Sequence, residues 1–216
     1  MTYFPLMLDL KDRPVLLLAG GPETKAKLQA LLEAEARLTV LAEEDGFGLE
    51  SLEREGRIRW IRRGYREGDL RGFFLVVSHP KDKAIHPLLR EEAERERVFL
   101  VTVDDPEHAS AIFPAVLRRG GLVVALSTSG AAPALAVRLK ERLAQLFPES
   151  YGALVAYLRT LRPRMARIPR FEERKRLWYR IVDEALEALD LDPHGGLPRA
   201  MAKAEEALQE VVEWTR

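Results

Sequence analysis

The residues of this chain that could carry out chemistry stand directly after short apolar runs. The first group follows Val15–Leu18 and consists of Gly20, Gly21, Pro22 and Glu23. A glycine pair between a buried strand and a helix lets the backbone approach a pyrophosphate at the helix N-terminus. The same strand, turn and helix also occurs in proteins that bind no nucleotide, so the loop favours a dinucleotide site without requiring one.

Two carboxylates follow the next apolar run. Glu43 and Glu44 come just after Arg37–Leu41, about twenty residues beyond the glycine pair, where dinucleotide-binding folds place an acid that binds the adenosine ribose. No arginine follows at once to hold a 2′-phosphate, which favours NAD over NADP. A solvated acidic loop would have the same sequence.

A third candidate is Asp104, which leaves the apolar run Val98–Val103 and precedes Asp105 and Pro106. Because an aspartate is ordinarily ionised at neutral pH, Asp104 can accept a proton or orient a substrate. An Asx turn before the proline is the structural alternative.

Metal ligands show no recognised spacing in the sequence. His79, His86 and His108 lie in or beside the predicted loops, but neither H-x-x-x-H nor H-E-x-x-H occurs, so we expect exposed loop histidines. The chain has no cysteine, which excludes disulfides, Cys-ligated zinc and iron–sulfur clusters within it. We therefore predict no resident metal.

A fourth candidate group precedes a helix predicted at residues 132–147. It consists of Ser127, Thr128, Ser129 and Gly130. Backbone N–H groups at such a position can bind an anion. The alternative is an ordinary N-cap, in which the Ser129 side chain accepts hydrogen bonds from the first free amides.

Charge is balanced in total but not along the chain. Lys+Arg and Asp+Glu number 34 each. Residues 151–182 carry nine Lys or Arg against two Glu, a net charge of +7, whereas residues 183–216 carry nine Asp or Glu against three Lys or Arg, a net charge of −6. The basic segment is either a surface for a polyanion or a solvated face paired with the acidic helices. The zero net charge argues against nucleic acid as a partner.

The elements that would position these residues alternate between strand and helix. Short apolar runs predict strands, and apolar residues three and four apart predict the helices between them. The predicted strands of the first half are residues 15–18, 37–41, 57–61, 73–77 and 98–103. This alternation is typical of an α/β fold with a doubly wound parallel sheet, which binds ligands at the carboxyl ends of its strands. From Tyr151 onward the pattern predicts helices alone.

No segment predicts a membrane span or a signal peptide. The longest apolar runs are far shorter than a bilayer requires, and the first ten residues are too interrupted for a signal sequence. The lack of cysteine is in keeping with a reducing compartment. We therefore expect a soluble, cytoplasmic protein without a membrane partner.

Several segments, taken together, match a known family. They are Phe4–Leu10, Leu31–Val40, Val103–Glu107, Ile112–Ala115, Gly121–Gly130 and Pro133–Ala136. Over nearly its whole length the chain resembles the precorrin-2 dehydrogenase family, which comprises the amino-terminal half of bifunctional siroheme synthases and their stand-alone relatives. The resemblance implies a Rossmann-like NAD-binding domain over residues 1–113, a dimerisation region over 114–149 and a small helical domain over 150–216.

The resemblance also implies an activity. It is the NAD-dependent oxidation of precorrin-2 to sirohydrochlorin by a homodimer, joined in some members by insertion of a divalent metal, iron or cobalt. The catalytic acid/base of the family falls on Asp104. Its NAD contacts fall on Gly20–Glu23 and on Glu43 and Glu44, and we assign substrate contacts to the matching stretch Ser127–Gly130.

The chain departs from the family pattern at the cofactor edge. The departures are Ala19 for the first glycine, Ser78-His79-Pro80 for the usual A-T-(D/N), Val101 for an asparagine and Ala111 for an aromatic residue. They leave two alternatives open, a sirohydrochlorin chelatase and a tetrapyrrole-binding homologue without efficient NAD-dependent activity. A non-enzymatic, NAD-responsive dimer is a third alternative, but no helix-turn-helix motif supports it.

Overall fold

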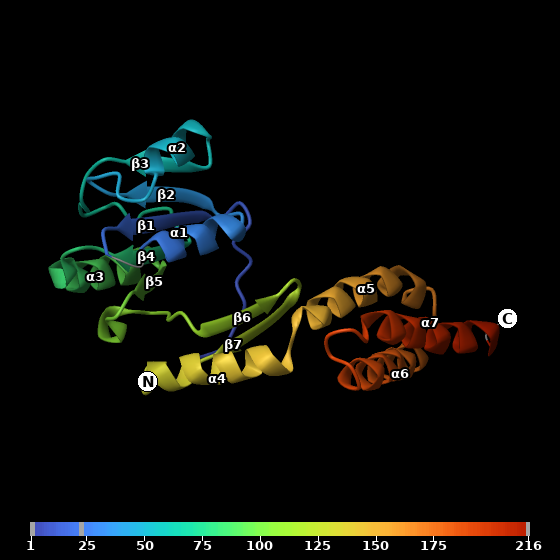
Figure 1. Ribbon diagram of the computed structural model, residues 1–216. Helices are drawn as coiled ribbons and strands as arrows, with labels where there is room; N and C mark the ends of the chain where they lie inside the picture. The colour runs from blue at the N-terminus through green and yellow to red at the C-terminus, as the bar shows by residue number, and fades with distance from the viewer. Residues whose placement is uncertain (1–2, 22–23, 215–216) are drawn as a thin grey trace. The chain divides into compact units, whose positions relative to one another are not determined.

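The computed structural model describes residues 3–21 and 24–214, with the backbone alone for residues 210–214. Pro22 and Glu23, two residues of the candidate glycine loop, lie outside the described residues. The chain divides into two compact units, Met1–Phe113 and Pro114–Arg216. Figure 1 shows the elements of each unit.

The first unit is built on a parallel sheet of five strands in the order β3-β2-β1-β4-β5. The strands are β1 (Pro14–Ala19), β2 (Arg37–Leu41), β3 (Ile58–Ile61), β4 (Leu75–His79) and β5 (Phe99–Thr102). Successive connections run outward from β1 to β2 and β3 on one side, and from β4 to β5 on the other. The predicted doubly wound parallel sheet is thus confirmed, and its switch point lies between β1 and β4.

The central strand explains why its sequence is a continuous apolar run. Val15 and Leu17 point into one hydrophobic core, whereas Leu16 and Leu18 point into a second core on the opposite face. All four side chains are buried. A strand covered on both faces loses the alternation of polar and apolar residues that a half-exposed strand retains.

Helices cover both faces of this sheet (Figure 1). The core that contains Val15 also holds Leu28 and Leu31 of α1 (Thr24–Glu33) and Leu49 of α2 (Leu49–Arg54). The core on the other face holds Leu89 and Ala93 of α3 (His86–Glu96). Two short 3₁₀ turns, Lys83–Ile85 and Pro106–His108, follow β4 and β5.

Two elements of the first unit differ from the sequence prediction. Strand β4 begins at Leu75 rather than at residue 73, because the Phe73 N–H closes a turn onto the Leu70 carbonyl. Helix α2 was not predicted. It is only six residues long, too short to show a helical repeat, and it begins where the Asp45 carboxylate accepts hydrogen bonds from its first two N–H groups.

The second unit begins with an antiparallel hairpin of β6 (Ala115–Arg119) and β7 (Leu122–Leu126). Four helices follow: α4 (Pro133–Leu146), α5 (Glu149–Met165), α6 (Phe171–Asp190) and α7 (Leu197–Trp214). Helix α5 crosses the turn of the hairpin at Gly152, where a Cβ atom would lie 2.3 Å from the Arg119 carbonyl oxygen. Glycine is therefore required for this close approach.

Helices α6 and α7 pack along one another (Figure 1). Their shared core is rich in alanine, namely Ala185, Ala188, Ala200, Ala204 and Ala207, all of them buried. Small side chains let the two helix axes approach closely. Within the part of the chain that the structure describes, no helix is both long and apolar enough to cross a membrane.

Candidate functional site

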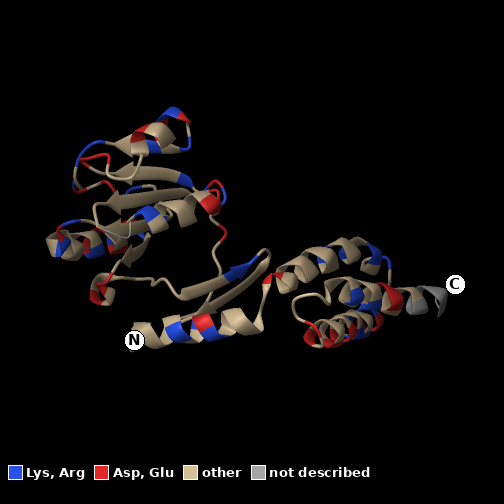
Figure 2. Ribbon diagram, viewed as in Figure 1, with Lys and Arg blue, Asp and Glu red and all other residues tan. Residues whose placement is uncertain are grey.

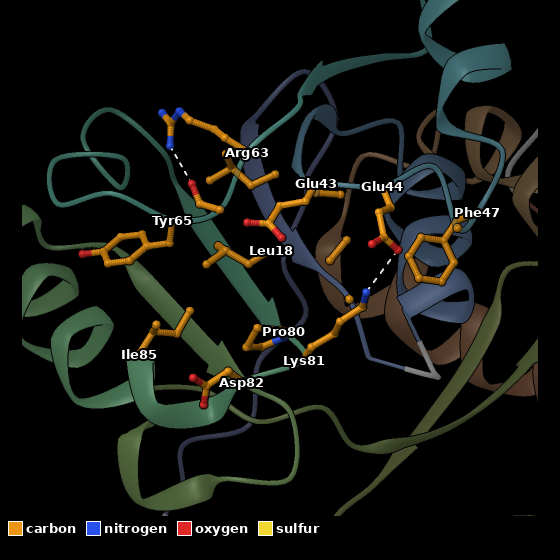
Figure 3. A pocket seen from close by; sticks show the side chains of 16 residues that line it. Leu18, Glu43, Glu44, Phe47, Arg63, Tyr65, Pro80, Lys81, Asp82 and Ile85 are labelled. Carbon is orange, nitrogen blue, oxygen red and sulfur yellow. Dashed lines mark hydrogen bonds and ion pairs between the residues drawn. The ribbon is translucent and has the colours of Figure 1, made fainter.

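A pocket of about 360 Å³ lies at the carboxyl ends of β1, β2 and β4 (Figure 3). Its walls come from the loops that follow these strands and include Gly20, Glu43, Glu44 and Lys81. The volume falls in the range of small-molecule sites. The structure thus brings together the glycine loop and the acidic pair that the sequence predicted, at the switch point of the sheet.

The glycine pair permits close contact between the loops after β1 and β4. A Cβ atom on Gly20 would lie 2.9 Å from the backbone nitrogen of Lys81, and one on Gly21 would lie 2.5 Å from His79 Nε2. The Gly21 N–H also donates to the His79 carbonyl oxygen at 2.7 Å. Larger residues at either position would force the two loops apart.

His79 and Thr24 form a buried polar pair beneath this loop. Thr24 is fully buried, and its Oγ1 accepts a hydrogen bond from the Gly20 N–H at 3.3 Å and lies 3.3 Å from His79 Nδ1. His79 is the last residue of β4 and is 3% exposed. The prediction of an exposed loop histidine is therefore wrong here, because the imidazole fills the space beside Gly21.

The acidic side of the pocket is open to solvent. Glu43 and Glu44 are exposed, and Figure 3 shows both side chains reaching into the pocket from the end of β2. Lys81 Nζ lies 3.1 Å from Glu44 Oε2, with both side chains more than two thirds exposed. An ion pair so exposed contributes little to stability. A ligand can therefore displace it at low cost.

The opposite wall is held by a buried glutamate. Glu92 of α3 is 1% exposed and accepts hydrogen bonds from the Tyr65 hydroxyl and from the Gly68 and Leu70 N–H groups, the last at 2.8 Å. Burial, together with the neighbouring Glu92 carboxylate, raises the pKa of the Tyr65 phenol. Tyr65 therefore stays protonated and holds the pocket wall against α3.

Arg63 lines the same wall and is also held in place. Its guanidinium donates to both Asp69 oxygens at 2.7 Å, and this contact lowers the pKa of the Asp69 carboxyl. Sequence reasoning missed Arg63 and Tyr65. They belong to a long loop between β3 and β4 whose fold depends on Glu92, far along the chain.

Asp104 follows β5 and does not line the pocket. Its side chain is 74% exposed, and Lys83 Nζ lies 3.9 Å from its Oδ2. Its backbone has φ of +58°, a left-handed conformation that is unfavourable for most residues other than glycine. The carboxylate is thus presented to solvent at the edge of the sheet, just after β5, the strand next to β4.

A buried network fixes the turn that carries Asp104. Asp105 Oδ2 lies 2.7 Å from His86 Nδ1 and 2.9 Å from His108 Nδ1. Burial raises the pKa of Asp105, but the hydrogen bonds of the two histidines outweigh it, and the net pKa is lowered. The Thr102 hydroxyl also donates to the Asp105 carbonyl oxygen.

His86 contradicts the prediction of an exposed histidine. Its side chain is fully buried at the start of α3, and its Nε2 has no hydrogen-bond partner among the described residues. His108 is about one third exposed. Across residues 3–21 and 24–214, no group of three or more His, Asp or Glu residues is arranged to hold a metal ion.

The fourth candidate group lies in the second unit and forms a turn before α4. Thr128 Oγ1 accepts from the Ala132 N–H and Ser127 Oγ from the Ser129 N–H, both at 3.0 Å. Ser129 and Gly130 have positive φ angles. The alternative that Ser129 caps the helix is wrong, because Ala132 is the N-cap residue of α4 and no side chain accepts a capping hydrogen bond there.

Comparison with known proteins places the chain in a family. A family described as putative NAD(P)-binding matches residues 6–115, slightly more than half of the chain. The chain belongs to this family. A second family, described as sirohaem biosynthesis protein central, matches residues 119–146, from the end of β6 through α4.

Two curated relatives of this chain are both named siroheme synthases. Siroheme synthase 3 of Aeromonas hydrophila is 38% identical over 183 residues, which cover 84% of this chain and 39% of that protein. The siroheme synthase of Sodalis glossinidius is 33% identical over 209 residues, or 96% of this chain and 44% of that protein. The chain thus spans about two fifths of the length of these curated relatives.

One solved structure matches over the whole chain. It is SirC, a precorrin-2 dehydrogenase, with a TM-score of 0.74, 25% sequence identity, and coverage of 98% of this chain and 100% of that one. The resemblance drawn from the sequence motifs is therefore confirmed, together with the Rossmann-like fold of the first unit.

Proposed function

We propose that this protein oxidises precorrin-2 to sirohydrochlorin with NAD as hydride acceptor. The observation that carries the proposal is the pocket at the switch point of the sheet, with Gly20 on one side and Glu43 and Glu44 on the other. Support also comes from the full-length similarity to SirC. The name of that protein supplies the substrate class.

The residues present suit a dinucleotide. The loop at Gly20 and Gly21 offers bare backbone where a Cβ atom would clash, which is what close approach to a pyrophosphate requires. Pro22 and Glu23 would complete that loop. Glu43 and Glu44 offer acceptors for ribose hydroxyls. When bound, NAD takes up the hydride that leaves the macrocycle.

Asp104 is proposed as the acid/base. Oxidation removes a proton from the macrocycle as well as a hydride, and an exposed carboxylate can accept that proton. Asp105, tied to His86 and His108, holds the turn in the conformation that presents Asp104. Ser127–Gly130 are proposed as substrate contacts, since the macrocycle carries carboxylates that N–H groups can bind.

The active form is proposed to be a homodimer, assembled through the region 114–149. Helix α4 exposes Leu135 and Leu146, and β6 exposes Val116, each at least 40% accessible. Two-stranded hairpins are marginally stable alone, and a second copy would cover these apolar side chains. The three-part division into residues 1–113, 114–149 and 150–216 is part of this proposal.

A second candidate is metal insertion into sirohydrochlorin, with iron or cobalt as substrate. The observation that favours it is the imidazole of His108, partly exposed beside the turn of Asp104. Metal insertion releases protons from the macrocycle nitrogens, and carboxylate and imidazole groups can accept them.

One experiment tests both candidates. The protein is incubated anaerobically with precorrin-2, with and without NAD, while NADH absorbance and the tetrapyrrole spectrum are followed. NAD-dependent formation of sirohydrochlorin is the expected result. If no sirohydrochlorin forms, the protein is instead incubated with sirohydrochlorin and Co²⁺. Insertion of Co²⁺ faster than the uncatalysed rate would then identify the protein as a chelatase rather than a dehydrogenase.

A further inference from the structure

A second pocket, of about 650 Å³, lies within the second unit between the end of α5 and the start of α6. Besides Met165 and Ala166, its lining combines two kinds of side chain. Three are cationic (Arg162, Arg174 and Lys175) and three are aromatic (Phe171, Trp178 and Tyr179). Among the described residues that line it, none is acidic.

The helical repeat of α6 builds one wall of this pocket. Phe171, Arg174, Lys175 and Trp178 are spaced at i, i+3, i+4 and i+7, so they share one face of the helix. Phe171 and Tyr179 are 63% and 61% exposed. Large aromatic faces left open together beside cations are suited to stacking against a flat ligand.

The cations differ from neighbouring arginines in their partners. Arg164 is paired in a bidentate contact with Glu205, and Arg180 Nε lies 2.8 Å from a carboxylate oxygen of Glu184. Arg162 and Lys175 form no ion pair with any carboxylate of the described chain. Arg174 is oriented by donation to the Ile168 carbonyl oxygen at 3.1 Å. Among the side chains that the structure describes, no carboxylate therefore neutralises Arg162 or Lys175 in the pocket.

Helix stability does not account for this charge order. Positive charges stabilise a helix near its carboxyl end and negative charges near its amino end. Beyond its first turn, α6 does the reverse. Arg174, Lys175 and Arg176 lie in its first half, and the acids Asp183, Glu184, Glu187 and Asp190 lie in its second half, the part of α6 that leads into α7 (Figure 2).

We propose that this pocket binds a planar aromatic polycarboxylate, with its carboxylates on Arg162 and Lys175 and its ring face on Trp178 and Tyr179. The choice of a tetrapyrrole as that ligand rests on the proposed function, because the product of that reaction is a conjugated, nearly flat macrocycle with several carboxylates. The site is lined by residues of the second unit alone and holds the macrocycle without NAD.

The test titrates the full chain with uroporphyrin I, a planar tetrapyrrole octacarboxylate, and follows quenching of tryptophan fluorescence without NAD. Arg162→Glu/Lys175→Glu should weaken binding about tenfold or more, since two charge-assisted contacts become repulsive. The matched control is Arg167→Glu/Arg176→Glu, which makes the same change of charge at exposed positions outside the pocket. It should change the affinity by less than about twofold. Trp178→Phe should remove most of the quenching.

Three outcomes would overturn the site. They are no binding by the parent chain, equal losses in the two double variants, and displacement of uroporphyrin by a single-stranded oligonucleotide at equal affinity, which would indicate a general polyanion surface. If the protein does not oxidise precorrin-2 with NAD but the variants change uroporphyrin affinity as expected, the proposed function is wrong and the proposed binding site is supported. If the protein oxidises precorrin-2 but the variants do not change uroporphyrin affinity as expected, only the proposed binding site is wrong.

Discussion

At the scale of single residues, Asp104 carries the proposed proton transfer. Asp104→Ala should lower kcat for precorrin-2 oxidation by about 10²–10⁴-fold, the usual contribution of a general acid or base. The Kd for NAD should stay unchanged, because Asp104 lies outside the pocket. Anaerobic kinetics and calorimetric titration with NAD measure the two quantities. A full loss of NAD binding or of folding would make Asp104 a structural residue.

The Asp105 carboxylate should make the free energy of unfolding depend on pH. Its folded-state pKa is lowered, so its contribution is fully present above the unfolded value, about 3.9, and is lost as pH falls through the lower folded value. Asp105→Asn should reduce the free energy of unfolding by about 1–3 kcal/mol at neutral pH.

This difference should shrink as pH falls below about 4. Urea unfolding at several pH values measures it, with Glu107→Gln as control, because Glu107 is exposed and lies in the same turn. A difference that stays constant with pH would contradict the role of the carboxylate charge.

Some site residues could be predicted from the sequence, whereas the contacts between distant residues could not. Gly20, Glu43 and Glu44 were found from spacing, because short-range order along a βαβ unit fixes where they lie. The pairing of Asp105 with His86 joins positions 19 residues apart, one in the turn after β5 and one at the start of α3. No local pattern reports such a contact, so the sequence suggested solvent exposure for a histidine that is fully buried.

At the scale of elements, the loop between β3 and β4 depends on α3. Glu92→Leu removes an acceptor from three donors and should lower the free energy of unfolding by about 1–3 kcal/mol or more. It should also raise the Kd for NAD several-fold, because Arg63 and Tyr65 line the pocket.

Glu92→Gln is the matched variant for this prediction. Its amide oxygen can accept from both N–H groups, and its NH₂ can donate to the Tyr65 oxygen, so stability should stay close to that of the parent. Thermal unfolding and calorimetry compare the two. Equal losses in both would mean that Glu92 acts by charge rather than by satisfying these donors.

Elements with strong apolar runs were predicted well, whereas short ones were not. Strands β1, β2 and β5 were predicted within two residues at either end because buried parallel strands are nearly all apolar. Strand β6 and helix α2 were missed. Each is five or six residues long, and β6 has three apolar residues followed by two arginines, without the alternation typical of a half-exposed strand.

At the scale of the whole molecule, the main prediction is that the chain forms a homodimer through α4. Leu135 and Leu146 are eleven residues apart, about three helical turns, and share one face of α4. Leu135→Glu/Leu146→Glu should convert a dimer into monomers, as measured by sedimentation velocity over a range of concentrations. Leu191→Glu, at another exposed leucine, should leave the dimer intact. A parent chain that sediments as a monomer would contradict the assembly.

The central place of β1 in its sheet has a consequence for how the chain folds as it is made. β1 pairs with β2 early, but its pairing with β4 joins Val15 to Leu75 and must wait until that distant segment has been synthesised. The pocket is lined from both halves. It is therefore completed only when the second half joins, so nucleotide present during refolding should favour this late step by mass action.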